Sequence, residues 1–426
     1  MKTVGICTLG CKVNTYESEY IINELTKNNF IIKDFNELCD IYVINTCTVT
    51  NTSDIKSRKM IRNAIKRNPN ALVIAMGCFI EANHDFHEDG VSIYLGNKDK
   101  SRIVDLINDY YKTKNIIRDI YKEEYNKFED MYINDFPGRT RAFVKIQDGC
   151  ENFCSYCIIP FVRGKCRSKD FDTVIKEVKD LISNGYHEIV LTGIHTGNYG
   201  VDINTSFASL LKALVQIDGL KRLRISSIEV TELNDEVLNI IKDSDIIVDH
   251  LHVPLQAGCD KILKLMNRKY DLKYFKNKIK EIKKIRPNIS ITTDIIVGFP
   301  YEDDIDFQTT LDTVKEIGFT KVHVFPYSLR SGTKAFDMPN QVDGNIKKQR
   351  ARKLLEVSKE CEIAYYNKFI GKDALVLIEN IKDGNSYGHT GNYLHIKINK
   401  ELKNNTFVNV KIKELDYPYL IGEVNE

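Results

Sequence analysis

Three cysteines lie close together near the middle of the chain, in the segment Cys150-Glu-Asn-Phe-Cys154-Ser-Tyr-Cys157. Thiolates at this CxxxCxxC spacing can hold three corners of a 4Fe-4S cluster and leave one iron free to bind a substrate. A structural zinc ion is the alternative, with Cys166 or His195 as the fourth ligand that a closed tetrahedral site requires. The segment therefore predicts a metal centre, and its spacing favours the iron–sulfur cluster.

Three other cysteines, Cys11, Cys47 and Cys78, are spaced 36 and 31 residues apart. Each follows a predicted strand. Loops at the carboxyl ends of parallel strands meet at one edge of an open sheet, so these cysteines can form a second three-thiol site. Three unrelated buried thiols are the alternative, and Cys7, Cys39, Cys259 and Cys361 are interpreted as such packing residues. The strands concerned are Thr3–Cys7, Ile41–Asn45 and Ala71–Met76.

The composition of the chain is that of an ordinary globular protein. It has 426 residues, 42% hydrophobic and 28% charged, with a net charge of +2 from 61 basic and 59 acidic residues, which indicates several folded domains. We find no export signal and no run of about 18 apolar residues, so we expect a cytoplasmic protein without a membrane span. Cytosolic thiols stay reduced, and the 11 cysteines are therefore better suited to metal ligation than to disulfides.

Because the net charge is close to zero, a polyanion would have to be recognised through a local basic patch. The segment Ser53–Arg67, a predicted helix that begins near Cys47, carries such a patch against the single acid Asp54. It predicts contact with a phosphate backbone, and a solvated helix face is the alternative. The basic residues of this segment are Lys56, Arg58, Lys59, Arg62, Lys66 and Arg67.

The elements that must position the first set of cysteines alternate between strand and helix. Helical patterns at Tyr16–Lys27, Ser53–Arg67 and Lys100–Tyr110 follow the three strands named above, which predicts an α/β domain with an open parallel sheet over residues 1–112. Residues 113–137 are charged and end at Pro137-Gly138, and we interpret them as a connector.

A second β/α series predicts a partial (β/α)6 barrel over residues 138–343, because six units are fewer than the eight of a full barrel. Cys150 follows the first of its strands, at the end of the barrel where active sites gather. A linking helix over 344–370 and a small antiparallel β-barrel over 371–426 complete the chain. The predicted central strands are Ala142–Gln147, Glu188–Thr192, Leu223–Ser227, His250–Pro254, Ile289–Val297 and Lys321–Phe325, and the terminal ones are Ala374–Ile378, Leu394–Ile398, Phe407–Ile412 and Leu420–Val424.

With Tyr156 before its last cysteine, the CxxxCxxC segment resembles the radical S-adenosylmethionine (SAM) signature. The segments around the other three cysteines resemble the motifs of the methylthiotransferase N-terminal domain, and residues 371–426 resemble the RNA-binding TRAM β-barrel. The resemblance covers essentially the whole chain. The methylthiotransferase segments are Gly10-Cys11-Lys12-Val13-Asn14, Asn45-Thr46-Cys47-Thr48-Val49 and Gly77-Cys78.

The family has three branches, which act on isopentenyladenosine in tRNA, on N6-threonylcarbamoyladenosine in tRNA, or on an aspartate of ribosomal protein S12. Three segments look most like the bacterial threonylcarbamoyladenosine branch. Lys12-Val13-Asn14 departs from the Pro-Lys-Asn of the ribosomal branch. A non-catalytic, zinc-containing RNA-binding protein is the further alternative. The three segments are Thr8–Asn14, Leu191–Gly200 and Arg224–Glu229.

The resemblance implies a cluster on Cys150, Cys154 and Cys157 that binds SAM and cleaves it to a 5′-deoxyadenosyl radical. A second 4Fe-4S cluster, held by Cys11, Cys47 and Cys78, would carry the sulfur. A second SAM would supply the methyl group, so that C2–H of adenosine 37 becomes C2–SCH3. The implied partners are a tRNA anticodon loop and an electron donor such as flavodoxin or ferredoxin, and we expect a monomer.

Further SAM-site residues are expected at the ends of the barrel strands. Thr192-Gly193 occupies the place of the family's glycine motif, or is a simple strand-to-loop turn. Glu229 is a candidate that could instead begin a helix. Arg163 and Arg167 could bind a carboxylate or phosphate, although a solvated basic loop is the commoner case. The full set of expected cofactor-binding residues is Tyr156, Thr192, Gly193, Ser227, Glu229, Gln256 and Asp294.

Overall fold

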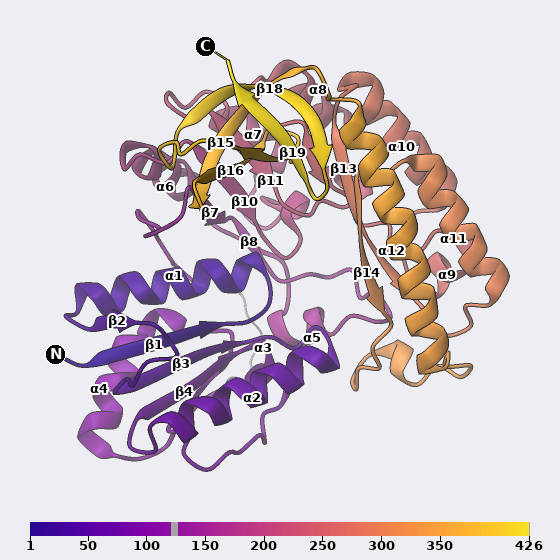
Figure 1. The fold of residues 1–426 in the computed structure, drawn as a ribbon. Helices are drawn as coiled ribbons and strands as arrows, with labels where there is room; N and C mark the ends of the chain where they lie inside the picture. The colour runs from indigo at the N-terminus through magenta and orange to yellow at the C-terminus, as the bar shows by residue number, and fades with distance from the viewer. Residues whose placement is uncertain (121–126, 426) are drawn as a thin grey trace.

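The computed structural model describes residues 1–120 and 127–425 (Figure 1). Its N-terminal part is an open parallel sheet with strand order β2-β1-β3-β4-β5-β6. β3 and β4 are buried at every position, as expected for strands covered by helices on both faces. The strands are β1 (Thr3–Thr8), β2 (Ile31–Lys33), β3 (Ile41–Thr46), β4 (Leu72–Gly77), β5 (Ile93–Leu95) and β6 (Ile117–Asp119).

Helices α1 (Lys12–Lys27) and α2 (Asn51–Arg67) lie on opposite faces of this sheet, and α3 (Cys78–Ala82) and α4 (Ile103–Thr113) complete the layers. The expected open sheet is therefore confirmed. The sequence did not predict β2, β5 and β6, because strands of three residues are too short to show a periodicity.

The segment interpreted as a charged connector, residues 113–137, contributes more structure than a connector would. β6 lies within it and pairs with β5. Met131, Ile133 and Phe136 are each at most 1% exposed and pack into the main core. Residues 121–126 of this segment lie outside the described residues.

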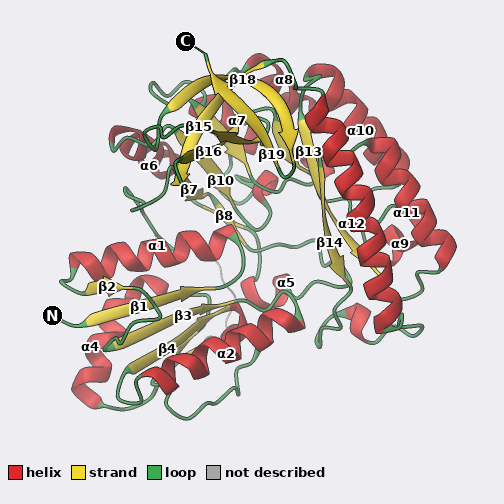
Figure 2. Cartoon of the chain, viewed as in Figure 1, coloured by secondary structure: helices red, strands yellow, loops and turns green. Residues whose placement is uncertain are grey.

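The central part is a partial barrel with strands in the order β7-β10-β11 and β12-β13-β14, and its helices cover the outside (Figure 2). Single parallel bridges at Leu223–Ile247 and Ser227–His252 join the two halves, which confirms the partial barrel. The strands are β7 (Arg141–Lys145), β10 (Glu188–Thr192), β11 (Arg222–Ile225), β12 (His250–His252), β13 (Ser290–Val297) and β14 (Lys321–Pro326), with the short pair β8 (Gln147–Asp148) and β9 (Arg167–Ser168) beside them. The helices are α5 (Ile159–Arg163), α6 (Phe171–Ser183), α7 (Phe207–Leu214), α8 (Asp235–Asp243), α9 (Asp260–Leu265), α10 (Leu272–Ile285) and α11 (Asp304–Ile317).

The long helix α12 (Gly344–Asn367) leads into a closed barrel with strand order β15-β16-β17-β19-β18. The pair β17–β19 is parallel, so the barrel departs from a purely antiparallel ring. β16 was not predicted, because Asn, Ser and Gly have low strand propensity and its register is set by pairing with β15 and β17. The strands are β15 (Asp373–Lys382), β16 (Asn385–Thr390), β17 (His395–Ile398), β18 (Phe407–Asp416) and β19 (Tyr419–Val424).

This closed barrel lies against the amino ends of the central strands. Arg141 at the start of β7 donates to Glu379 over 2.9 Å, and Arg222 of β11 donates to the carbonyl of His389 over 3.0 Å. The opposite, carboxyl end of the partial barrel is left for the cysteine loops. No helix in residues 1–120 or 127–425 is both long and apolar enough to cross a membrane.

Candidate functional site

Cys11, Cys47 and Cys78 lie at the carboxyl ends of three neighbouring strands. Cys11 caps α1 after β1, Cys47 directly follows β3, and Cys78 begins α3 after β4. Burial raises the pKa of Cys47, and the nearby Cys78 and Cys11 thiols raise it further. The structure therefore brings the three widely spaced cysteines together at one edge of the sheet.

Two neighbours of Cys11 hold this edge in place. Asn14 donates to the carbonyls of Leu9 and Thr46, over 2.7 and 3.0 Å, and so ties the chain before Cys11 to the chain before Cys47. Gly10 has a φ of +101°, and a Cβ built on it would lie 2.9 Å from the Cys47 sulfur. A glycine is therefore required for Cys47 to approach the backbone beside Cys11.

Cys150, Cys154 and Cys157 occupy the loop between β8 and α5. Burial raises the pKa of Cys157 to about 12, with the Cys154 and Cys150 thiols as further causes. The guanidinium of Arg268 donates to the Cys154 sulfur over 3.3 Å. A nearby donor and three clustered thiols fit an anionic iron–sulfur group.

The zinc alternative required Cys166 or His195 as a fourth ligand, and both lie beside Cys150. The His195 Nδ1 is 3.9 Å from the Cys150 sulfur, while its other nitrogen is paired with Glu232. Desolvation lowers the pKa of His195, but hydrogen bonds with Cys150, Cys166 and Glu232 raise it to about 12. In the part of the chain that the structure describes, these thiols and His195 do not form a group whose ligand atoms all lie within 4.8 Å of one another, as the ligands of a single zinc ion would. A cubane, whose corners are farther apart, fits them better.

A buried cluster of charges connects the two cysteine sites. Arg163 at the end of α5 is 1% exposed and donates to Glu17 and Asp148 over 3.0 Å and to Asn14 over 2.8 Å. Burial lowers the pKa of Arg163, but the nearby Asp148, Cys78 and Glu17 raise that pKa well above its ordinary value. Lys145 also pairs with Glu17, over 2.9 Å, and thereby joins β7 to α1.

This arrangement corrects the solvated-loop interpretation of Arg163 and Arg167. Both are buried, and Arg167 donates to the carbonyl of Arg163 over 2.8 Å. The physical reason is that a buried guanidinium needs carboxylate partners, which here come from α1 and β8, two segments far apart in the sequence.

A pocket of about 200 Å³ lies between the two cysteine loops. It is lined by Val49 and Thr50, which follow Cys47, and by the predicted cofactor residues Tyr156, Gln256 and Asp294. The Gln256 amide N–H donates to the carbonyl of Asp294 over 2.8 Å, which holds the ends of β12 and β13 together. The rest of the lining comes from β13, through Ile296, and from the end of β14 and the residues after it, through Phe325, Pro326, Tyr327 and Ser328.

The other predicted cofactor residues do not line this pocket. Glu229 forms an ion pair with Arg268 and caps a short helical turn at Val230–Glu232, which confirms the alternative that it begins a helix. Thr192 is buried at the end of β10. A Cβ on Gly193 would lie 3.1 Å from the Gln147 side chain, so a glycine permits close packing there. Ser227 is exposed and bridges to His252 in β12.

Sequence reasoning missed Arg268, which contacts both the Cys154 sulfur and Glu229. It lies between α9 and α10, in an Asn-Arg-Lys-Tyr run without a recognisable motif. Its contact with Cys154 crosses 114 positions of the sequence, so only the fold reveals it.

The predicted basic helix, α2, begins beside the Cys47 loop, but its basic residues have different roles. Arg62 pairs with Glu88 over 2.9 Å, and Arg67 donates to the carbonyl of Phe35 over 2.7 Å. These two residues stabilise the N-terminal domain itself. Lys56, Arg58, Lys59 and Lys66 are exposed, and their contact with RNA stays a prediction.

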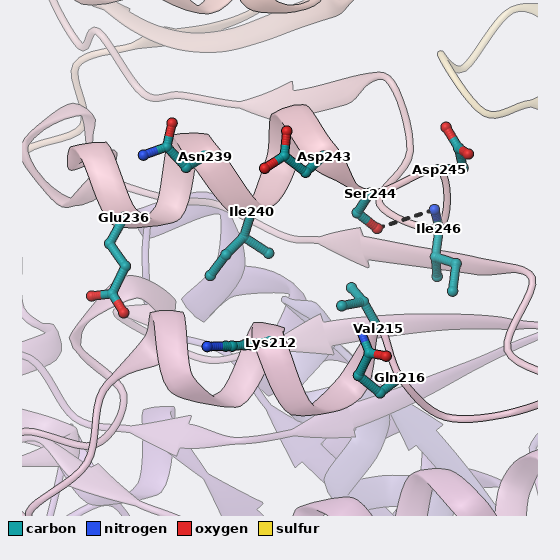
Figure 3. Close-up of a pocket in the computed structure, with 10 residues that line it drawn as sticks. All are labelled: Lys212, Val215, Gln216, Glu236, Asn239, Ile240, Asp243, Ser244, Asp245 and Ile246. Atoms are coloured by element: carbon teal, nitrogen blue, oxygen red, sulfur yellow. Dashed lines mark hydrogen bonds between the residues drawn. The ribbon is translucent and has the colours of Figure 1, made fainter.

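A larger groove of about 580 Å³ lies on the outer helical layer, between α7 and α8 (Figure 3). Lys212 of α7 and Glu236 of α8 line it from the two sides. At its edge, the backbone N–H of Ile246 donates a hydrogen bond to the Ser244 hydroxyl. The groove contains neither a cysteine nor a predicted cofactor residue. The smaller pocket between the cysteine loops is therefore the candidate active site.

Known proteins resemble this chain over nearly all of its length. Residues 144–314 match the radical SAM superfamily, and residues 3–93 match the uncharacterized protein family UPF0004. A threonylcarbamoyladenosine tRNA methylthiotransferase, MtaB, from Bacillus subtilis is 41% identical, over 99% of this chain and 96% of that protein. A tRNA-2-methylthio-N(6)-dimethylallyladenosine synthase from Lachnoclostridium phytofermentans is 36% identical, over 100% and 96%.

The fold also resembles that of a solved structure. The radical SAM methyltransferase TsrM from Kitasatospora setae, with cobalamin and a [4Fe-4S] cluster bound, aligns with a TM-score of 0.58 and 12% identity. The alignment covers 78% of this chain and 76% of that one. At this identity the likeness concerns the fold.

Proposed function

This chain belongs to the radical SAM methylthiotransferase family, and we propose that it attaches a methylthio group to C2 of N6-threonylcarbamoyladenosine at position 37 of tRNA. SAM and two 4Fe-4S clusters are its cofactors. The observation that carries the proposal is that one pocket is lined both by Val49 and Thr50, which follow Cys47, and by Tyr156, which lies between Cys154 and Cys157. The 41% identity with the threonylcarbamoyladenosine enzyme, against 36% with the dimethylallyladenosine enzyme, supports this choice of base.

We assign the six cysteines as cluster ligands, Cys150, Cys154 and Cys157 in one site and Cys11, Cys47 and Cys78 in the other. When bound, the clusters supply the one-electron cleavage of SAM and the sulfur for insertion.

The residues around Cys154 and Cys150 position the first site. Arg268 donates to the Cys154 sulfur, and Glu229 holds that guanidinium in place. Glu232 orients His195 toward Cys150 in the same way. Paired donors of this kind stabilise negative charge on the thiolates without leaving an uncompensated cation when the site is empty.

We assign SAM binding to the strand-end residues, with Tyr156, Gln256 and Asp294 in the pocket itself. Thr192, Gly193, Ser227 and Glu229 lie at the neighbouring strand ends. The apolar side chains Val49, Ile296 and Phe325 share the pocket wall and exclude water from a radical that would otherwise react unselectively.

The target base must leave its stack to reach this pocket, which costs least in a single-stranded anticodon loop. We assign backbone contacts to the exposed basic residues of α2 and a TRAM-like role to the closed barrel. Flavodoxin or ferredoxin as the electron donor, action as a monomer and a cytoplasmic location complete the proposal.

The test is mass spectrometry of nucleosides from tRNA that carries N6-threonylcarbamoyladenosine without a C2 substituent. The tRNA is incubated anaerobically with reconstituted protein, SAM and dithionite. We expect a methylthio adduct on that nucleoside. An adduct on isopentenyladenosine alone would overturn the choice of base, and release of 5′-deoxyadenosine without any tRNA adduct would favour the aspartate of ribosomal protein S12.

A further inference from the structure

Three side chains that can bind a metal ion meet on neighbouring strands of the partial barrel, with no cysteine among them. They are His252 of β12, Asp294 of β13 and His323 of β14, and one ligand atom of each lies within 4.8 Å of the other two. Among the described residues, this is the one set of three His, Cys, Asp or Glu side chains with that spacing. Ligands of one transition-metal ion, each about 2.0–2.2 Å from it, lie at most about 4.4 Å apart, so small side-chain rotations suffice to bind an ion here.

The register of the strands brings these side chains to one face. Asp294 is directly opposite His323 in the parallel pair β13–β14, and His252 is opposite Thr292 in the pair β12–β13. The Nε2 atom of His252 lies 3.2 Å from Oδ2 of Asp294. Within the described part of the chain, this histidine is the ion-pair partner of Asp294, and no lysine or arginine lies at ion-pair distance from it. A permanent cation of the protein therefore does not take the place of a metal ion.

Thr292 orients one of the two histidines. Its hydroxyl lies 2.9 Å from Nδ1 of His252 and 3.1 Å from Nε2 of His250, which is two residues earlier on β12. When Nδ1 of His252 carries the ring proton and donates a hydrogen bond to Thr292, the lone pair of Nε2 faces Asp294. Metal-binding histidines are oriented in this way, by a hydrogen bond from the ring nitrogen that does not bind the metal.

The three side chains adjoin the pocket between the cysteine loops. Asp294 itself lines that pocket. Ile296 and Phe325, which also line it, are two residues further along the same strands than Asp294 and His323, and residues two apart on a strand share a face. An ion held by His252, Asp294 and His323 therefore lies beside the candidate active site.

We propose that His252, Asp294 and His323 bind a divalent transition-metal ion such as Zn²⁺, separately from both cysteine sites. Two imidazoles and one carboxylate are a ligand set that suits zinc or ferrous iron and leaves at least one coordination position for water or another oxygen ligand. The bound ion adds positive charge to the wall of the pocket. The second oxygen of Asp294 remains for the contact with SAM proposed above. This inference goes beyond the proposed function, and neither depends on the other.

The closed barrel contains the same residue types in an arrangement that does not favour a metal ion. Nδ1 of His389 lies 3.1 Å from a carboxylate oxygen of Glu379, but that carboxylate already accepts a hydrogen bond from Arg141 over 2.9 Å. The rings of His389 and His395 are stacked, with centroids 4.5 Å apart and planes only 8° from parallel. Lone pairs of ring nitrogens lie in the ring planes, so those of two stacked rings do not point at a common ion. His395→Ala is therefore the matched control.

Zinc binding by the reconstituted protein tests the site. Protein with both clusters loaded is washed anaerobically with EDTA, to remove iron outside the clusters, and dialysed against Zn²⁺ at a series of buffered free concentrations. Zinc and iron per chain are then measured by inductively coupled plasma mass spectrometry. The proteins compared are wild type, His323→Ala, Asp294→Asn, Thr292→Val and His395→Ala. Because His323 is exposed, its truncation should not disturb folding.

We expect the wild type to bind about one zinc ion per chain at this site. Thr292→Val should weaken binding by about 10–100-fold, as loss of an outer partner of a metal ligand does. His323→Ala and Asp294→Asn each lose a ligand and should weaken it by more than about 100-fold. His395→Ala should bind zinc as the wild type does. The zinc X-ray absorption spectrum of the wild type should show nitrogen and oxygen ligands at about 2.0–2.2 Å and no sulfur at about 2.3 Å.

Two results would overturn the proposal. One is a His323→Ala variant that keeps the wild-type iron content and binds zinc with the wild-type affinity. The other is a sulfur shell in the X-ray absorption spectrum, which would place the zinc on cysteines. Should a variant lose iron, the spectrum of the wild type decides the question without it. Neither result bears on methylthio transfer, which the nucleoside assay tests separately.

Discussion

The two cysteine sites of this protein are built by opposite routes. Cys150, Cys154 and Cys157 lie within eight consecutive residues on one loop, so the covalent chain itself keeps them close. Cys11, Cys47 and Cys78 come from the ends of β1, β3 and β4 and meet only when these strands pair in parallel. The first site is local, and the second depends on the tertiary structure.

The charged side chains around the two cysteine sites also differ. Around the local site, two separate pairs face the sulfurs, Arg268 with Glu229 at Cys154 and His195 with Glu232 at Cys150. Around the tertiary site, Arg163 connects α5, α1 and β8 through carboxylates that are fully buried. Changes in packing should therefore affect the tertiary site first, whereas the local site should respond mainly to loss of its own ligands.

Removal of one ligand from each site gives the largest expected effect. Cys150→Ala should abolish SAM cleavage, because two thiolates cannot hold the cluster that binds the cofactor. Cys47→Ala should leave 5′-deoxyadenosine release near the wild-type rate and abolish methylthio product. Chromatography of both products under single-turnover conditions measures the two outcomes.

Cys361→Ala, on α12 and away from both sites, is the matched control and should change neither product. If Cys47→Ala also stopped SAM cleavage, the two sites would not be separable in the way that their different construction indicates.

Loss of the charge cluster between the sites should have the next largest effect. Arg163→Met leaves Glu17 and Asp148 buried with fewer cations, and we expect the free energy of unfolding to fall by about 3–5 kcal/mol. Urea unfolding under anaerobic conditions measures the change. Arg62→Met removes an exposed pair with Glu88 and should cost less than about 1 kcal/mol. Equal effects of both variants would contradict a structural role for the buried cluster.

The difference between the sites also explains what could be predicted from the sequence. The local site was visible in its spacing. Convergence of Cys11, Cys47 and Cys78 could be inferred because a parallel sheet places all strand ends at one edge. Arg268 could not be found, because its contact with Cys154 depends on how the α9–α10 connection folds over the loop. For Arg163 the sequence allows either a carboxylate partner or a solvated loop, and it cannot identify Glu17 and Asp148 as the partners because they lie in distant segments.

The same limit applies to the fold. The open sheet and the partial barrel follow from long strands with clear hydrophobic patterns, such as Ile41–Thr46 and Ser290–Val297. β16 was missed because its sequence, Asn-Ser-Tyr-Gly-His-Thr, favours turns, and it becomes a strand only between β15 and β17. Elements whose conformation comes from their neighbours cannot be found from local propensity.

One methyl group added beside Cys47 can also distinguish the two sites, with a smaller loss of stability than Arg163→Met. Gly10→Ala puts a Cβ 2.8 Å from that of Cys47 at a φ of +101°, so we expect a loss of about 1–3 kcal/mol in stability and weaker iron loading at the tertiary site. Gly138→Ala is the matched control, because it also has a positive φ, +76°, but nothing within 4 Å of its Cβ. Iron per chain after reconstitution and anaerobic thermal unfolding provide the readouts. Should both variants load iron equally, close contact with Cys47 would not be what requires glycine at position 10.

The smallest expected effect concerns the RNA next to the tertiary site. Lys56 and Lys59 are exposed on α2, which begins beside Cys47, whereas Arg67 of the same helix is bound to Phe35. Because each phosphate contact contributes about 0.9 to the slope of log affinity against log salt concentration, Lys56→Gln with Lys59→Gln should lower that slope by roughly 2. Filter binding of tRNA at several salt concentrations measures it. The matched control, Lys276→Gln on α10 of the central barrel, should leave the slope unchanged, since its ammonium is paired with Glu316 over 2.7 Å. An unchanged slope in the double variant would assign the RNA to another face, and would separate the tertiary cysteine site from the surface that holds the substrate.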